Sequence, residues 1–172
     1  MKIEQASMKP QDIVVLLKII AHGDKPWQQI PMANELCFSQ SEMSRSLARS
    51  KHSGLLDDSG RKVRRLALMD FLEHGIAYVF PQHPGPLVRG IATSHSALPL
   101  KDQIQSDEHY VWPSAKGKLK GQSIVPLHKS VPDAALKDAL LYEMLSLVDA
   151  IRVGSVREKK LAVAELKQRI LG

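Results

Sequence analysis

The sequence contains little cysteine, few aromatic residues and no long apolar run. Cys37 is the only cysteine among 172 residues, so the chain can form no internal disulfide and no zinc site built on several thiols. Aromatic residues make up only 5%, which argues against a large β-sandwich and against an aromatic platform for single-stranded bases. No window approaches 18 uninterrupted apolar residues, and the first residues form no apolar signal segment. We therefore expect a cytoplasmic protein with no membrane contact.

The chain does have enough apolar residues for a core and an excess of positive charge. Hydrophobic residues make up 44%, which excludes wholesale disorder. The net charge is +6 and is concentrated early: residues 1–65 hold 11 Lys and Arg against 7 Asp and Glu, and residues 39–65 hold 7 against 3. A local positive field favours a polyanionic partner, although an ordinary solvated basic surface has the same composition.

Helical periodicity predicts three helices in the first third of the chain, over residues 10–21, about 27–36 and 40 to about 51. Pro10 suits the first turn of the first helix. Ser39 and Glu42 form a capping box, in which each side chain can bond the other residue's backbone N–H, so the third helix begins at Gln40. The first third is thus expected to be helical, with a short turn at Cys37 and Phe38.

The rest of the chain predicts one more helix, an irregular β-rich middle and a helical end. Most of the ten prolines fall between residues 78 and 132, with a turn at Lys116-Gly117. The expected helices span 63–74, 132–151 and 156–171, and the expected strands span 77–80, 87–92 and 123–127. The predicted fold class is α+β, with a helix-turn-helix unit over 1–75 and a second unit over 76–172 that ends in a helix pair.

Residues 32–47 have the features that a helix-turn-helix requires. Ala33 is a small residue inside the first helix, which lets the second helix approach closely. Ser39 caps the second helix, whose outer face must be polar to meet base edges and phosphates. The apolar residues expected to fill the wedge between the helices are Met32, Leu36, Phe38, Met43 and Leu47. A pair of helices that serves only packing or protein contact is the alternative interpretation.

These residues, with Gly54-Leu55-Leu56 after them, resemble the DNA-reading segment of bacterial winged-helix regulators of the MarR and IclR type. The resemblance covers about residues 8–65 and implies a second helix that reads the major groove, with dimerisation through helices outside this unit. The residues expected to read bases are Gln40, Ser41, Ser44 and Arg45. The residues expected to hold phosphates are Arg49, Lys51, Arg61, Lys62, Arg64 and Arg65.

Two positions depart from the pattern of these regulators. Cys37 stands in the turn where glycine is usual, which indicates either a non-glycine turn or mild backbone strain. Its apolar neighbours predict a buried thiol that packs as a small hydrophobe, with a redox switch as the alternative. The wing hairpin should follow Leu56, but the polar run 57–62 leads into a predicted helix. The wing is therefore expected to be short or absent.

The remaining polar residues predict no catalytic, metal or cofactor site. The seven histidines have no metal-ligand spacing, and Ser94 beside His95 lacks the surroundings of a hydrolase nucleophile. Lys116, Lys118 and Lys120 are interpreted as a solvated hairpin rather than as phosphate contacts. We therefore expect no enzyme but a sequence-specific repressor that binds double-stranded DNA as a homodimer, with residues 76–172 open to a protein partner or small effector. The alternative is an antitoxin or defence-system component that binds a partner protein through this region, with autoregulatory DNA binding.

Overall fold

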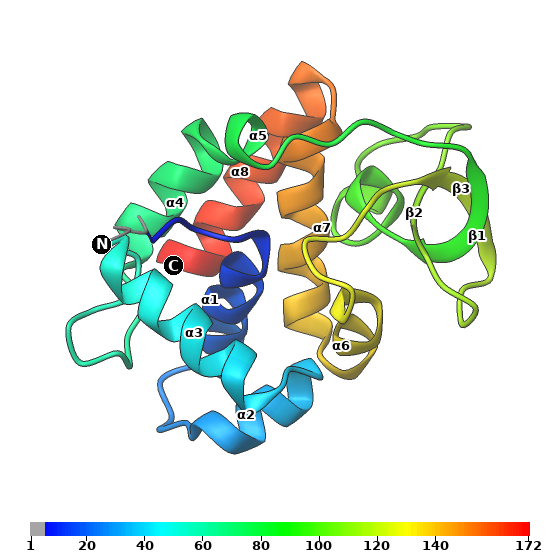
Figure 1. Cartoon of the computed structure of the whole chain (residues 1–172). Coiled ribbons are helices and arrows are strands. Elements are labelled where there is room, and N and C mark those ends of the chain that lie inside the picture. Colours follow the sequence, from blue (N-terminus) through cyan, green and yellow to red (C-terminus); the bar gives the residue numbers. More distant parts are fainter. Residues whose placement is uncertain (1–5) are drawn as a thin grey trace, which may run out of the picture.

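The computed structural model describes residues 6–172 and confirms the mixed α+β class (Figure 1). Its helices within this range are α1 (Pro10–His22), α2 (Gln29–Leu36), α3 (Gln40–His52), α4 (Arg65–His74), α5 (Ile76–Val79), α6 (Val131–Lys137), α7 (Ala139–Val153) and α8 (Val156–Leu171). Its strands are β1 (Leu87–Ala92), β2 (Tyr110–Pro113) and β3 (Leu119–Ser123), and short 3-10 turns span Ser94–Ser96 and Leu100–Asp102. No helix within 6–172 is long and apolar enough to cross a membrane.

Two helices, α1 and α7, form the centre of the molecule (Figure 1). Every residue of α1 from Asp12 to Ile20 is buried, because α3, α7 and α2 pack around it. The helix α8 lies along α7 and also contacts α4. The buried apolar side chains form one cluster on both sides of residue 75, so the two predicted units share a core. That residues 1–75 form a separate domain stays a prediction.

The three strands close into a small barrel at one side of α7 (Figure 1). β1 pairs antiparallel with both β2 and β3, which are parallel to each other. Closure of so small a barrel depends on glycine. A Cβ on Gly90 would lie 2.1 Å from the carbonyl oxygen of Trp112, and one on Gly121 would lie 2.6 Å from that of His109. Only a residue without a side chain allows backbones to approach this closely.

The expectations for the middle of the chain are partly wrong. β1 lies where a strand was expected, and a turn forms at Lys116 as predicted. Residues 77–80, however, belong mostly to α5, because tertiary packing that buries Ile76 beside α4 outweighs their strand-favouring composition. The strand expected over 123–127 lies earlier, as β3, where Gly121 permits barrel closure. β2 was not expected at all.

The helical ends of the chain follow the prediction with two local changes. The helix expected over 132–151 is interrupted at Asp138, whose side chain caps α7 by accepting from the backbone N–H of Leu141 at 3.1 Å. The helix expected from residue 63 begins instead at Arg65, because Val63 pairs with Leu56 in a hairpin. The helices α1, α3 and α8 have the expected bounds within one residue.

A buried polar cluster fastens the barrel to α7. The carboxylate of Asp149, which is 1% exposed, accepts from the Thr93 hydroxyl at 2.7 Å and from the Trp112 indole N–H at 2.7 Å. The guanidinium of Arg152 lies 2.9 Å from the same carboxylate and also donates to the Phe80 carbonyl. Residues from β2, from the end of β1 and from the segment before β1 thus converge on one turn of α7.

Candidate nucleic-acid interface

The helix-turn-helix is formed by α2, a tight turn and α3. Cys37 ends α2 in the left-handed conformation (φ 58°, ψ 35°), and the N–H of Phe38 donates to the carbonyl of Ala33 at 2.9 Å. Ser39 and Glu42 form the predicted capping box: the Ser39 hydroxyl accepts from the Glu42 N–H at 3.1 Å, and the Glu42 carboxylate accepts from the Ser39 N–H at 2.9 Å. The turn therefore keeps its glycine-like geometry with a cysteine in place, at the cost of mild backbone strain.

The prediction of a buried Cys37 is wrong, because the structure exposes its side chain. The left-handed turn directs Leu36 and Phe38 into the core and leaves Cys37 between them on the surface. Its sulfur lies 3.6 Å from the ammonium group of Lys137, at the end of α6. The thiol is thus accessible at the joint between the two helices of the motif.

The outer face of α3 is polar, as predicted. Met43, Ser46 and Ser50 turn toward the protein interior. The four residues expected to read bases are all exposed, and their spacing places them on one stripe: Gln40, Ser41, Ser44 and Arg45. The Ser44 hydroxyl accepts from the Gln29 side-chain amide at 2.6 Å, which ties the stripe to α2. Lys51 is exposed about 1.7 turns beyond Arg45.

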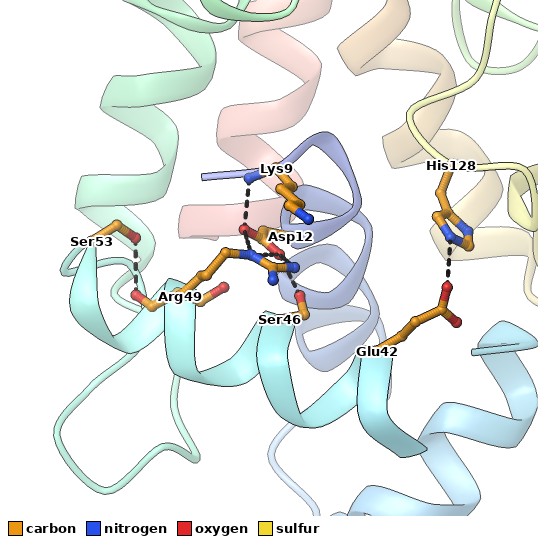
Figure 2. A network of polar contacts seen from close by, with 8 residues as sticks. Lys9, Asp12, Glu42, Ser46, Arg49, Ser53 and His128 are labelled. Carbon is orange, nitrogen blue, oxygen red and sulfur yellow. Dashed lines mark hydrogen bonds and ion pairs between the residues drawn. The ribbon is translucent and has the colours of Figure 1, made fainter. Parts of the chain in front are cut away.

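Arg49 does not lie on this stripe. Its guanidinium donates to the carboxylate of Asp12 through Nε at 2.9 Å and through Nη2 at 2.8 Å, and its side chain is only 14% exposed (Figure 2). The same carboxylate accepts from the Ser46 hydroxyl at 2.6 Å and from the Lys9 backbone N–H at 2.9 Å (Figure 2). Arg49 therefore holds α3 against α1, and we leave it out of the phosphate contacts expected from the sequence.

A short wing follows α3. Leu56 and Val63 form one antiparallel bridge, flanked by backbone hydrogen bonds from Asp57 to Lys62 at 2.8 Å and from Arg64 to Leu55 at 2.8 Å. Arg61 anchors this hairpin to the segment between α1 and α2. Its guanidinium carbon lies 4.8 Å from the centre of the Trp27 ring. The Trp27 indole N–H donates to the Arg61 carbonyl at 3.0 Å, and the Arg61 guanidinium donates to the Trp27 carbonyl at 3.0 Å. This cation–π contact stabilises the position of the wing against the segment between α1 and α2.

The other residues expected to hold phosphates lie in or beside the wing, and they differ in exposure and in bonding partners. A hollow of about 750 Å³ between the wing and the α1–α2 segment is lined by Lys25, Arg61, Lys62 and Arg65 among others. Lys62 is exposed, and Arg64 is exposed 3.6 Å from Asp58. Arg65 is half-buried, with its guanidinium bound to the carbonyl of Ile170 at 2.8 Å. Arg61, Lys62 and Arg64 are thus exposed beside α3, with Arg61 held by Trp27 and Arg64 near Asp58, whereas Arg65 is half-buried and bound to Ile170.

The chain matches no protein-family model, no curated protein and no solved structure. The resemblance to winged-helix regulators therefore stays an expectation drawn from residues 8–65.

The sequence raised two other candidate sites, a histidine-based metal site and the pair Ser94 and His95. No group of three or more His, Cys, Asp or Glu side chains within residues 6–172 is placed to hold a metal ion. Ser94 and His95, adjacent in sequence, are both buried. His95 donates through Nε2 to the carbonyl of Glu108 at 2.8 Å, with Glu158 3.2 Å from its other ring nitrogen. The ring thus has partners other than the Ser94 hydroxyl.

Sequence reasoning missed a contact between the C-terminal half and the start of α3. The His128 ring lies 4.4 Å from the Phe38 ring, and its Nε2 lies 3.7 Å from the Glu42 carboxylate (Figure 2). The Ser130 backbone N–H donates to Nδ1 at 3.2 Å, so Nε2 carries the proton that faces Glu42. Burial lowers the pKa of His128 despite the nearby Glu42 carboxylate. Because 90 residues separate Phe38 from His128, no local pattern signals this contact.

Acid should loosen the wing through Asp57. Hydrogen bonds from the Lys62 N–H, the Ser59 hydroxyl and the Arg61 N–H lower the pKa of Asp57 from 3.8 to about 2. Since the folded pKa lies below the unfolded one, this carboxylate stabilises the wing above pH 3.8 and loses that effect as pH falls toward about 2. An NMR titration should show the Arg61 and Lys62 amides moving with Asp57. The Asp57→Asn variant should lack this transition and Asp58→Asn should retain it; an ordinary pKa for Asp57 would contradict the assignment.

Proposed function

We propose that this chain is a double-stranded DNA-binding regulator of transcription that reads the major groove with α3. The observation that supports this most is the stripe of Gln40, Ser41, Ser44 and Arg45, which is exposed, polar and free of acidic residues. Amide, hydroxyl and guanidinium groups match the donors and acceptors that base edges present there. The tight turn and the capping box hold α3 in the geometry that such insertion needs.

Phosphate contacts are assigned to the expected cations that are exposed beside α3. These are Lys51 at the end of α3 and Arg61, Lys62 and Arg64 in the wing. Phosphate contacts set register and orientation, whereas base contacts carry sequence preference. A regulator of this kind works in the cytoplasm of a bacterial cell, and we propose repression as its mode because a protein seated in the groove blocks access to the DNA.

Substitutions of Arg45 and of Lys51 should weaken DNA binding in different ways. Arg45 lies in the middle of α3, where a guanidinium can pair bidentately with guanine, so Arg45→Ala should weaken operator binding by about 1–3 kcal/mol and relax preference at one base pair. Lys51→Ala should weaken all sequences equally and make the slope of log K against log salt shallower by about 1. Binding is measured on selected and scrambled duplexes at several salt concentrations.

Arg157→Ala serves as the control for charge, because Arg157 is exposed on α8, away from α3. It should change neither sequence preference nor affinity by more than the small effect of one distant charge. Equal weakening of selected and scrambled DNA by Arg45→Ala would refute the assignment of Arg45 to base reading. The proposal as a whole fails if the wild-type protein binds no duplex at low salt.

Exposed leucines support a second candidate, a protein partner for residues 76–172. Leu98 is 47% exposed and lines a hollow of about 260 Å³ with Ala139 and Tyr142, and Leu136 and Leu140 are exposed on the adjoining ends of α6 and α7. Exposed apolar side chains that lie near one another are typical of protein contact surfaces. We propose that this surface joins two copies into the homodimer. Sedimentation of the purified chain as a monomer would favour the alternative, an antitoxin or defence component that binds a different protein.

A further inference from the structure

The outer face of the barrel carries two positive charges directly opposite each other. Arg89 in β1 pairs in register with Lys120 in β3, and both side chains are exposed. Directly opposed residues of an antiparallel pair point to the same face with their Cβ atoms about 4.5–5.5 Å apart, and like charges in this arrangement destabilise a sheet. The opposed cations Arg89 and Lys120 are therefore expected to lower the stability of the barrel.

A third cation lies beside this pair. The loop between β2 and β3 passes so close to β1 that a Cβ on Gly117 would lie 2.0 Å from the carbonyl group of Gly90. This contact places Lys118, the exposed neighbour of Gly117, next to the strand that carries Arg89. Of the ion pairs formed by described residues, none includes Arg89, Lys118 or Lys120, while Lys116 in the same loop is paired with Asp133 at 2.9 Å.

A short stretch of chain connects the barrel to a residue that contacts the start of α3. Lys120 lies eight residues before His128, which contacts Glu42 in the first turn of α3. Eight residues span at most about 29 Å even when fully extended. One turn of B-DNA is about 34 Å long. Lys120 and His128 are therefore separated by no more than about one helical turn of B-DNA, which is the reach that a shared duplex requires.

We propose that the outer face of the barrel, formed by Arg89, Lys118 and Lys120, binds the phosphate backbone of the DNA that flanks the segment read by α3. This inference rests on the proposed function of α3 and extends the contact to the second half of the chain. The polyanion supplies the negative charge that the opposed cations lack within the described part of the chain. Contacts to backbone phosphates add affinity and orientation but carry no sequence preference.

The test compares two double variants with equal loss of charge. Arg89→Ser/Lys120→Ser removes the opposed pair, and Lys159→Ser/Lys160→Ser removes two exposed cations from α8. Each is titrated with a random-sequence duplex of about four helical turns at several salt concentrations. For the barrel variant the slope of log K against log salt should become shallower by about 2, since each phosphate contact contributes about 0.9. The α8 variant should keep the wild-type slope.

Three further results decide the matter. An unchanged slope for the barrel variant, with wild-type DNA binding intact, would overturn this inference and leave the role of α3 standing. Absence of duplex binding by the wild-type protein would overturn both. The melting temperature of the barrel variant should equal or exceed that of wild type, because a like-charge pair has been removed. A melting temperature below that of the α8 variant would mean that the pair serves the fold, and would refute the proposal.

Discussion

Replacing Arg49 with methionine should lower the free energy of unfolding by about 3–5 kcal/mol, because it leaves the carboxylate of Asp12 buried without its cation. Asp12 has no exposed surface, and the remaining hydrogen bonds from Ser46 and the Lys9 backbone cannot neutralise its charge. Methionine retains much of the side-chain volume, so the loss reports charge and hydrogen bonding rather than a cavity. Chemical denaturation followed by circular dichroism measures it.

Arg45→Met is the matched control for this experiment, since it removes the same charge from an exposed position of the same helix. It should change stability by no more than about 0.5 kcal/mol. The double variant Asp12→Asn/Arg49→Met should be less destabilised than the sum of its single changes, because the two side chains interact directly. Equal, small effects of Arg49→Met and Arg45→Met would show that the buried pair does not hold α3 in place.

Replacing Arg152 with methionine should be equally costly, about 3–5 kcal/mol near neutral pH, because Asp149 then carries a buried charge with no cation beside it. The loss should shrink on acidification. Burial raises the pKa of Asp149 even while Arg152, Thr93 and Trp112 oppose the shift, and without Arg152 it should rise further. A raised folded pKa means that the neutral carboxyl stabilises the fold at low pH and that this contribution fades as pH rises.

Denaturation of Arg152→Met at a series of pH values tests this expectation, with fluorescence of the buried Trp112 as one of its reporters. Arg157→Met is the control, because Arg157 is exposed in the first turn of α8. It should follow the wild-type pH profile. Equal destabilisation of Arg152→Met at all pH values would contradict this expectation. The lost stability would then come from packing and from the hydrogen bond that Arg152 donates to the Phe80 carbonyl, not from the charge of Asp149.

The helix-turn-helix was predictable because it is made by contacts between near neighbours. The capping box joins Ser39 to Glu42 over three residues, and the turn at Cys37 is closed by bonds between residues three to five positions apart. Contacts between such near neighbours can be recognised from short patterns in the sequence. The exposure of Cys37 was not predictable from its apolar neighbours, because the left-handed turn reverses which positions face the core.

Arg49 shows why the face of a helix is harder to assign than its bounds. Positions four apart share a side of a helix, but each such step rotates by about 40°, because a turn holds 3.6 residues. Arg45 and Arg49 were therefore expected on one face, and the extra rotation brings Arg49 toward α1. What decides its role is Asp12, which lies 37 residues earlier in the chain. Nothing in the spacing of residues along α3 indicates that partner.

The sequence by itself determined the fold class, the bounds of α1, α3 and α8, and the polar stripe of α3, since local capping and periodicity set these features. Only the tertiary structure decided that Arg49 is structural, that three strands close into a barrel and that Arg89 opposes Lys120. It also decided that His128 reaches the start of α3. Each of these joins residues from 12 to 86 positions apart, and such contacts depend on how the core packs rather than on the order of neighbouring residues.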